Sequence, residues 1–356
     1  MEDSETLEIY KFPQAKYIDA LRWFSPLSAF SKFVVLALHD SDSDISTIEI
    51  KTLNLSNQSK PFLQLHSSWT SPSRVSSLRV SQTPHKPILS ASTFDGSLHF
   101  LFAHPVEVSL DSEISVGEKG FHIGPISGID LFGNNGVECV SVGEDGRVNL
   151  VSLGGDSKAS YRQVFDSQGL VSYTAVKWAS PTEFVTGGLG DSLQWWDLRK
   201  PGGVVSQFKG SWAHGNTSGI VHSIDIHPSR KHVCVAGGSS GAVFAWDLRR
   251  QQQQILLSGS GHGEAKPHSF SESEIWEVQY DCYTPSSDIG NTSSAQILPV
   301  MTCSEDGILA IVEKDVEPEQ ILAEPCAVNS FDINLQNPSD VICSLEWESV
   351  AYLSRQ

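Results

Sequence analysis

The sequence predicts an all-β protein, a seven-bladed WD40-type β-propeller. An apolar–x–apolar pair, typical of a strand with alternating faces, recurs seven times at intervals of 57, 51, 47, 48, 54 and 53 residues. Most pairs precede a second apolar run and a turn, and the clearest unit, Ile220–Arg249, ends its third strand in Trp246-Asp247. Strand units that repeat at this length and close on Trp-Asp are typical of propeller blades.

The seven pairs mark the expected innermost strand of each blade, and they cover nearly the whole chain. They are Leu21/Trp23, Leu78/Val80, Ile129/Leu131, Val176/Trp178, Ile224/Ile226, Val278/Tyr280 and Phe331/Ile333. The second runs end in turns such as Asp95-Gly, Asp145-Gly and Asp306-Gly, where glycine supplies the positive φ that tight hairpins require.

The two ends of the chain complement each other. The last unit, from Phe331 on, has room for about three strands, whereas propeller blades have four. Leu7–Pro13 has strand character but no local partner, so we expect it to complete the last blade and close the ring. Residues 1–356 are then a single domain, in which 250–273 and 284–296 are inserted surface loops.

The polar tetrad that braces many WD blades is broken in this sequence. Leu101, Val151 and Val312 stand where its tryptophan is expected in the three Asp-Gly units, and Gly190 and Ser240 stand at the aspartate position of the units that keep Trp196 and Trp246. We therefore expect packing, more than polar networks, to hold the blades. His122, His214 and His262 precede inner strands and are expected to be structural, not ligands.

The charge and the composition exclude several classes of partner. The net charge of −18 and the pI of about 5.0 argue against nucleic acid and against direct contact with an anionic membrane. The acidic start of the chain lacks the apolar core of a signal peptide, and the six cysteines form no C-x-x-C pair. We expect a soluble protein in a reducing compartment.

No motif in the sequence predicts catalysis. Residues 237–241 fit G-x-S-x-G, but a strand follows them where a nucleophile elbow requires a helix. The histidines form no metal-binding pattern, and no group of nucleophile, base and oxyanion donors can be assembled. We expect no enzyme activity, no cofactor, no metal and no small-molecule substrate.

Two W-D-x-R sequences leave an alternative open. Arg199 and Arg249 each end such a motif, which in some propellers presents the arginine to the adaptor of a cullin–RING ubiquitin ligase. The chain would then be a ligase substrate receptor. The competing interpretation is an ordinary strand end, whose arginine is solvated or paired to an acidic neighbour.

Several segments resemble one family when they are taken together and in order. They are VSVGEDGRVNL, AGGSSGAVFAWDLR, SEIWEVQYDCYTP, MTCSEDG and the closing VNSFDINLQNPSDVICSLEWESVAYLSR. They resemble the small, about forty-three-kilodalton, WD-repeat nucleoporins of the Y-shaped outer-ring complex of the nuclear pore, in the plant-like version. The resemblance covers the chain from about residue 125 onward, and V-G-E-D-G-R and S-E-I-W-E-V are its most discriminating parts.

The resemblance implies a structural scaffold subunit located in the nucleus, at the nuclear envelope. It implies a platform for other Y-complex nucleoporins, above all the α-solenoid subunit of the short arm. Support of mRNA and protein transport would follow indirectly, because the subunit helps to build the ring.

Overall fold

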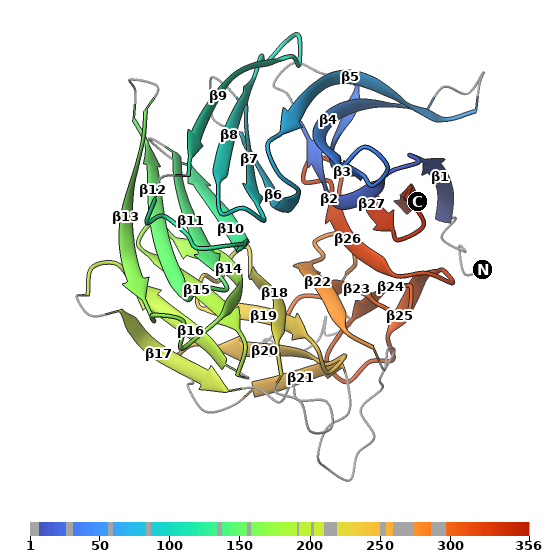
Figure 1. Cartoon of the computed structure of the whole chain (residues 1–356). Helices are drawn as coiled ribbons and strands as arrows, with labels where there is room; N and C mark the ends of the chain where they lie inside the picture. Colours follow the sequence, from blue (N-terminus) through green and yellow to red (C-terminus); the bar gives the residue numbers. More distant parts are fainter. Residues whose placement is uncertain are drawn as a thin grey trace. The chain divides into compact units, whose positions relative to one another are not determined.

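The computed structural model is built entirely of β-strands in the residues that it describes. These are 7–25, 31–55, 60–82, 87–117, 119–133, 137–154, 158–190, 192–200, 203–209, 219–249, 254–258, 273–285 and 297–355. The strands form seven four-stranded sheets, and no helix occurs in these ranges (Figure 1). The predicted all-β class, a seven-bladed β-propeller, is confirmed.

The sheets belong to two compact units. Unit 1 comprises Met1–Leu170 and Ser330–Gln356, and unit 2 comprises Val171–Asn329. In order across each sheet, the strands of unit 1 are β2 (Tyr17–Phe24), β3 (Lys32–Asp40), β4 (Ile45–Asn54) and β5 (Phe62–Ser71); β6 (Val75–Gln82), β7 (Pro87–Thr93), β8 (Leu98–Ala103) and β9 (Leu110–Val116); β10 (Ile126–Gly133), β11 (Val137–Gly143), β12 (Arg147–Leu153) and β13 (Ala159–Asp166); and β26 (Val328–Ile333), which begins two residues before the unit does, β27 (Asp340–Leu345), β28 (Ser349–Arg355) and β1 (Leu7–Pro13).

Unit 2 contains the other three sheets. Their strands, again in order across each sheet, are β14 (Tyr173–Ser180), β15 (Glu183–Gly188), β16 (Ser192–Asp197) and β17 (Val204–Lys209); β18 (Val221–Ile226), β19 (Val233–Gly238), β20 (Val243–Asp247) and β21 (Gln254–Ser258); and β22 (Ile275–Tyr280), β23 (Val300–Ser304), β24 (Ile308–Val312) and β25 (Glu319–Ala323).

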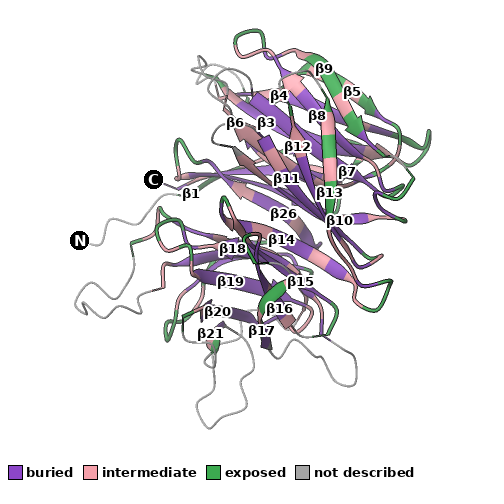
Figure 2. Cartoon of the chain, turned by 90° about the vertical axis from the view of Figure 1, so that its left-hand side faces the viewer, coloured by how far each residue is buried: buried purple, intermediate pink, exposed green. Residues whose placement is uncertain are grey.

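The apolar–x–apolar pairs mark the same position in every sheet. All seven lie in the first strand of a sheet, from Leu21 in β2 to Phe331 in β26. The second strands are buried along their length, as the continuous apolar runs predict, whereas the edge strands β5, β9 and β13 carry the exposed stretches visible in Figure 2. The alternation of apolar and polar residues thus located the innermost strands correctly.

The hydrophobic core of unit 1 lies between neighbouring sheets. Val35 of β3 and Leu78 of β6 pack in one cluster, which joins the first sheet to the second. Phe100 of β8 and Ile129 of β10 pack in another, which joins the second sheet to the third. All four side chains are fully buried, so the burial of each contributes close to the full transfer free energy of about 1.5–3 kcal/mol.

The middle residue of each apolar pair often links neighbouring first strands. Arg79 of β6 pairs with Asp130 of β10 at 3.8 Å. Within unit 2, Lys177 of β14 pairs with Asp225 of β18 at 3.2 Å, and the other oxygen of Asp225 accepts the backbone N–H of Tyr280 at 2.9 Å. Charged residues therefore bridge the sheets at positions that strand alternation leaves outside the apolar core.

The N-terminal strand completes the last sheet, as the chain ends predict. β1 pairs with β28 in antiparallel register from Leu7↔Arg355 to Pro13↔Ser349. Phe12 is 7% exposed and packs in a cluster that spans the last and first sheets of unit 1. The predicted closing strand is confirmed, and the edge of β28 is covered.

The structure differs from the sequence-based interpretation in the stretch 250–273, which was expected to be loop throughout. Gln254–Ser258 form β21, the edge strand of the sheet that contains Trp246. Its apolar residues Ile255, Leu256 and Leu257 pack against neighbouring clusters, which gives this short run a partner in spite of its glutamine-rich flank. Residues 286–296 of the other predicted loop lie outside the described residues. The single domain over 1–356 stays a prediction.

Candidate interaction surface

The two arginines of the ligase alternative are each folded back on a neighbouring aspartate. Arg199 donates from Nε and Nη2 to the two carboxylate oxygens of Asp197 at 2.8 and 2.9 Å. Arg249 makes the same two bonds to Asp247 at 3.0 and 2.8 Å. The hydrogen bonds from Arg199 lower the pKa of Asp197 to about 2. Both guanidinium groups are exposed, and each is already engaged in a two-point ion pair within its own W-D-x-R motif.

The serine of the G-x-S-x-G sequence has a structural partner. Ser239 Oγ accepts the backbone N–H of Ile220 at 2.8 Å, and the strand β20 follows the turn. In the described part of the chain, no three His, Cys, Asp or Glu side chains gather as a metal site would require. No helix there is long and apolar enough to cross a membrane.

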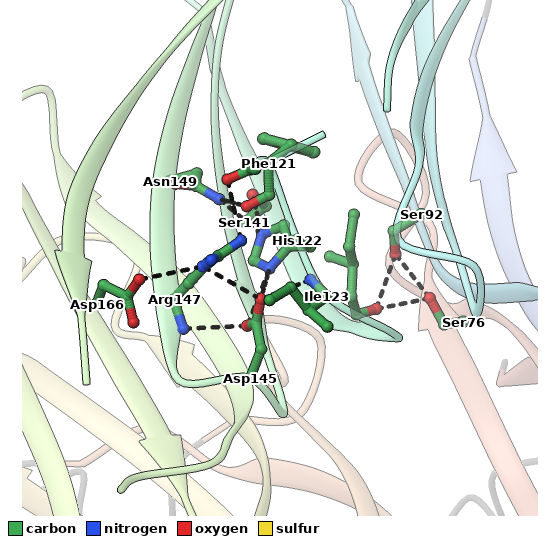
Figure 3. Close-up of polar contacts among 12 residues, drawn as sticks. Ser76, Ser92, Phe121, His122, Ile123, Ser141, Asp145, Arg147, Asn149 and Asp166 are labelled. Atoms are coloured by element: carbon green, nitrogen blue, oxygen red, sulfur yellow. Dashed lines mark hydrogen bonds and ion pairs between the residues drawn. The ribbon is translucent and has the colours of Figure 1, made fainter. Parts of the chain in front are cut away.

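His122 is the centre of a buried polar network in the third sheet (Figure 3). Its Nδ1 lies 3.1 Å from Asp145 Oδ1, and its Nε2 lies 3.0 Å from Ser141 Oγ. The tryptophan position is occupied by Val151, as the sequence predicts, but Asn149 on the same strand reaches His122 Nε2 at 3.1 Å. The structural role predicted for His122 is confirmed. His214 and His262 lie outside the described residues.

The third sheet therefore keeps a buried polar network although its tetrad is broken, and the expectation that packing contributes more than polar networks stays a prediction. Asn149 also donates to the backbone carbonyl of Phe121 at 2.7 Å, so it ties the network to the loop before β10. Sequence reasoning missed it because an asparagine two residues before the tryptophan position is not part of the familiar tetrad. The available signal was an asparagine at the centre of the apolar run 148–151, since a polar side chain that is buried in such a strand requires partners.

Asp145 couples this network to the protein surface. One carboxylate oxygen accepts the backbone N–H of Ile123 at 2.8 Å, and the other accepts that of Arg147 at 3.1 Å. Burial would raise the pKa of Asp145, but the hydrogen bonds from His122 and from these backbone groups outweigh burial and lower it. The carboxylate therefore stays ionised and fixes the loop that carries Ile123.

The second sheet contains a related network built from other residues. Asp95 accepts from Thr93 and Ser97, and Ser97 lies 2.7 Å from His99 Nε2. His99 Nδ1 lies 2.7 Å from Glu113 Oε1, whose second oxygen accepts Trp69 Nε1 at 3.0 Å. The chain of contacts continues from the Asp-Gly turn to β5 of the first sheet and braces that turn.

These turns lie at one end of the sheets of unit 1, which we call the loop face. In each sheet, neighbouring strands are antiparallel and run in the order first, second, third and fourth. The second strand therefore returns to the end at which the first began, so the loop into the first strand and the turn between the second and third strands lie at the same end. Large apolar residues are exposed there. They are Tyr17 (43%), Ile45 (48%), Phe94 (49%), Ile123 (69%), Leu170 (88%) and Trp347 (65%).

Contacts between neighbouring loops make this face continuous. The Arg74 guanidinium lies over the ring of Tyr17 at 5.8 Å. The backbone carbonyl of Arg74 accepts the N–H of Phe94 at 3.0 Å. Gly96 follows in the same turn at φ +88°, and a Cβ there would lie 2.8 Å from the carbonyl oxygen of Gly124. The turn that carries Phe94 and the loop that carries Ile123 are therefore in close contact.

Exposed carboxylates surround the apolar residues of the loop face. They are Asp42, Asp44, Asp95, Glu144 and Glu346. Of the basic residues on the described parts of the same loops, Lys16 pairs with Glu49 and Arg74 pairs with Asp19, while Lys119 is exposed. The described loops at the opposite end of these sheets carry Lys60, Lys158 and a single carboxylate, that of Glu107. Negative charge is concentrated at the loop face.

Three of the known proteins similar to this chain carry the name Nup43. The chain is 56% identical over its full length to the nuclear pore complex protein NUP43 of Arabidopsis thaliana, of which it covers 99%. It is 30% identical to the human nucleoporin Nup43 over 54% of this chain and 43% of that one, and 28% identical to the mouse Nup43 over 62% and 52%.

No protein-family model matches the sequence. The similarity to these nucleoporins does not support the ligase alternative, since none of the three proteins is named for ubiquitin transfer. The match to the Arabidopsis protein extends over both units and over the residues on which the family resemblance did not depend, including the first hundred. With this identity from end to end, the chain belongs to the Nup43 family of nuclear pore complex proteins.

Proposed function

We propose that the protein is a structural scaffold subunit in the outer ring of the nuclear pore complex, within the Y-shaped complex. The observation that carries this proposal is the 56% identity, over the full chain, to a protein named as a nuclear pore complex component. Its location is the nuclear envelope. The protein supports passage of mRNA and protein indirectly, as one of the parts from which the ring is built.

The architecture suits a scaffold. The sheets present rigid, hydrogen-bonded edges, and buried networks such as that of His122 fix the turns between the strands. Loops held in this way lose little conformational entropy when a partner binds. The apolar and acidic loop face of unit 1 is a surface through which such a subunit can bind its neighbours.

The α-solenoid subunit of the short arm of the Y complex is the partner that we propose. A solenoid stacks helices into a long curved surface that offers extended binding sites. A rigid platform joined to it in a permanent assembly is expected to bury about 1,000–2,000 Å² in total.

Localisation and co-purification of the tagged protein test the proposal. A fluorescently tagged full chain should mark the nuclear rim in interphase and recover slowly after bleaching. Affinity purification should yield the Y-complex members in near-equal amounts, with the α-solenoid retained at the highest salt concentration. A diffuse cytosolic signal, together with purification of ubiquitin-ligase subunits and no nucleoporins, contradicts the proposal.

A further inference from the structure

We propose that the loop face of unit 1 docks a segment of another pore subunit, one that carries large aliphatic or aromatic side chains flanked by lysine or arginine. This inference rests on the proposed function, because a scaffold subunit has a permanent neighbour. It goes further by assigning the surface and the chemistry of the segment that binds there.

The first argument is the apolar surface itself. Single exposed apolar residues are ordinary, and Val106 and Leu335 are two such residues at the opposite end of unit 1. At the loop face, by contrast, large exposed apolar residues occur on the loops of all four sheets. Phe94 and Ile123 lie on loops that touch through Gly96 and Gly124. Apolar side chains gathered at one end of four sheets gain free energy when a partner covers them.

The second argument is that the protein holds these side chains in place. The backbone at Ile123 is fixed by the buried carboxylate of Asp145, and the backbone at Phe94 is fixed by the carbonyl of Arg74. Trp347 lies in the turn between β27 and β28. The residue after it, Glu348, has φ +57°, and its backbone carbonyl accepts the N–H of Gln14 at 2.7 Å. Fixed anchors of this kind bind with a smaller entropic cost than mobile loops.

The third argument is charge, which determines what kind of segment fits. Exposed carboxylates at Asp42, Asp44 and Glu144 flank the apolar residues, while Lys16 and Arg74 already pair with carboxylates of the protein itself. A segment that brings lysine or arginine beside its apolar side chains is therefore complementary to this surface. An acidic or purely apolar segment is not.

The same charges disfavour a second copy of this chain as the occupant. Two loop faces brought together around a two-fold axis would oppose one cluster of carboxylates with another. Because the net charge is −18, the remainder of each molecule adds to the repulsion. Complementarity therefore favours a different protein.

Matched variants of the full chain test the docking surface. The apolar variant, Phe94→Ser with Ile123→Ser, alters two exposed residues of the loop face, and its control, Val106→Ser with Leu335→Ser, alters two exposed apolar residues at the opposite end of unit 1. The charge variant is Asp42→Asn, Asp44→Asn and Glu144→Gln, with Glu107→Gln as its control. Asparagine also tolerates the φ of +54° at position 44.

Each variant is expressed with a tag, and the pore subunits that co-purify are quantified against wild type. We expect the amount of pore subunits that co-purify with the apolar variant to fall about tenfold or more, as it does when hot-spot residues are removed, while the control retains them. The charge variant should bind less tightly and lose most of the wild-type sensitivity to salt. Thermal melting of each purified variant verifies that the fold is intact.

Carboxylate-to-lysine cross-linking of the wild-type complex identifies the occupant. A zero-length carbodiimide joins a carboxylate to an amine only when the two are in contact. We expect Asp42, Asp44, Glu144 or Glu346 to be joined to lysines of a pore subunit that lie beside large apolar residues.

The outcomes separate this inference from the proposed function. If wild type purifies with pore subunits, and the loop-face variants do so equally well, docking on this face is overturned while the scaffold role stands. Cross-links from these carboxylates to a second copy of the chain, or loss of binding in the opposite-end control alone, also overturn it. Wild type that binds no pore subunit contradicts the proposed function itself.

Discussion

The backbone N–H of Ile123 donates to Asp145 Oδ2 at 2.8 Å, so a buried carboxylate holds an exposed isoleucine in position. The same carboxylate lies 3.1 Å from His122, which is fully enclosed. A network that would be structural in any propeller thus also determines the shape of the loop face. Asparagine, which is isosteric but uncharged, should weaken both roles at once.

We expect Asp145→Asn to lower the free energy of unfolding by about 1–3 kcal/mol, since hydrogen bonds to a charged group are the ones lost. Chemical denaturation at pH 7 measures this change. Glu144→Gln is the control, because Glu144 is exposed in the same turn and should change stability by about 0.5 kcal/mol or less. Equal stability of the two variants would show that the network does not brace the loop.

The contribution of Asp145 to the free energy of unfolding also depends on pH. Its pKa in the folded protein lies below that of an unfolded aspartate, so its contribution is complete above about pH 4 and is lost as the pH falls through the folded value. The difference in stability between wild type and Asp145→Asn should therefore narrow in acid. A constant difference from pH 7 to pH 3 would contradict the assigned cause.

The closing strand offers a second test, in which the two faces of β1 serve as each other's control. Phe12 is 7% exposed and packs between sheets, so Phe12→Ala should cost about 3–5 kcal/mol. Ile9, on the same strand, is 39% exposed, and Ile9→Ala should change little. Thermal melting with light scattering measures stability and aggregation together.

Removal of residues 1–13 should have a larger effect than either substitution, because it exposes the whole edge of β28. We expect a lower melting temperature and aggregation of the truncated protein. Unchanged melting and solubility would mean that the pairing of β1 with β28 contributes nothing to stability.

The lowered pKa of His227 predicts a loss of folding stability in mild acid. Burial, reinforced by the charge of Arg230 and opposed by that of Asp225, lowers the pKa of His227 below its ordinary value. The unfolded chain therefore binds a proton at this position more readily than the folded protein. Its stabilisation is complete above about pH 6.5 and declines as the pH falls further.

The variant His227→Asn should flatten this dependence. Asparagine can still accept the N–H of Ser229, which in the wild type lies 3.2 Å from His227 Nδ1, but it does not titrate. Melting temperatures between pH 7.5 and pH 5.5 should fall less steeply for this variant than for wild type. Parallel slopes would assign the acid sensitivity to other groups.

The W-D-x-R arginines should be dispensable for assembly. Each is exposed and bonded to its own aspartate, so Arg199→Ala and Arg249→Ala should leave the melting temperature nearly unchanged and should leave co-purification with pore subunits intact. Loss of binding to a captured ligase adaptor in either variant, with the fold preserved, would instead revive the ligase alternative.

Sequence reasoning succeeded where a local pattern determines the structure. Alternation around Leu21 or Phe331 defines a strand face, and the missing partner of Leu7–Pro13 predicted its pairing with the last sheet. It failed where the outcome depends on residues far apart in the chain. The role of Asn149 requires His122 to be positioned 27 residues away, and no spacing rule encodes that contact.

The loop face was also beyond reach from the sequence. Ile123 and Phe94 are ordinary apolar residues in the sequence, and only the fold leaves them exposed on two loops that touch. The strand at Gln254–Ser258 was hidden for a related reason, because its polar neighbours dominate the composition of that stretch. Composition describes a segment, whereas exposure depends on what packs against it.

The pairing of β1 with β28 has a consequence for synthesis on the ribosome. β1 is among the first strands to emerge, but its partner Ser349–Arg355 is the last strand in the described chain. At about 5–20 residues per second, the intervening chain takes roughly 20–70 s to translate. For that time the edge of β1 lacks its native partner strand, and Phe12 lacks its contacts with the last sheet. The nascent protein must therefore stay shielded from its neighbours on the same polysome until its final strand is complete.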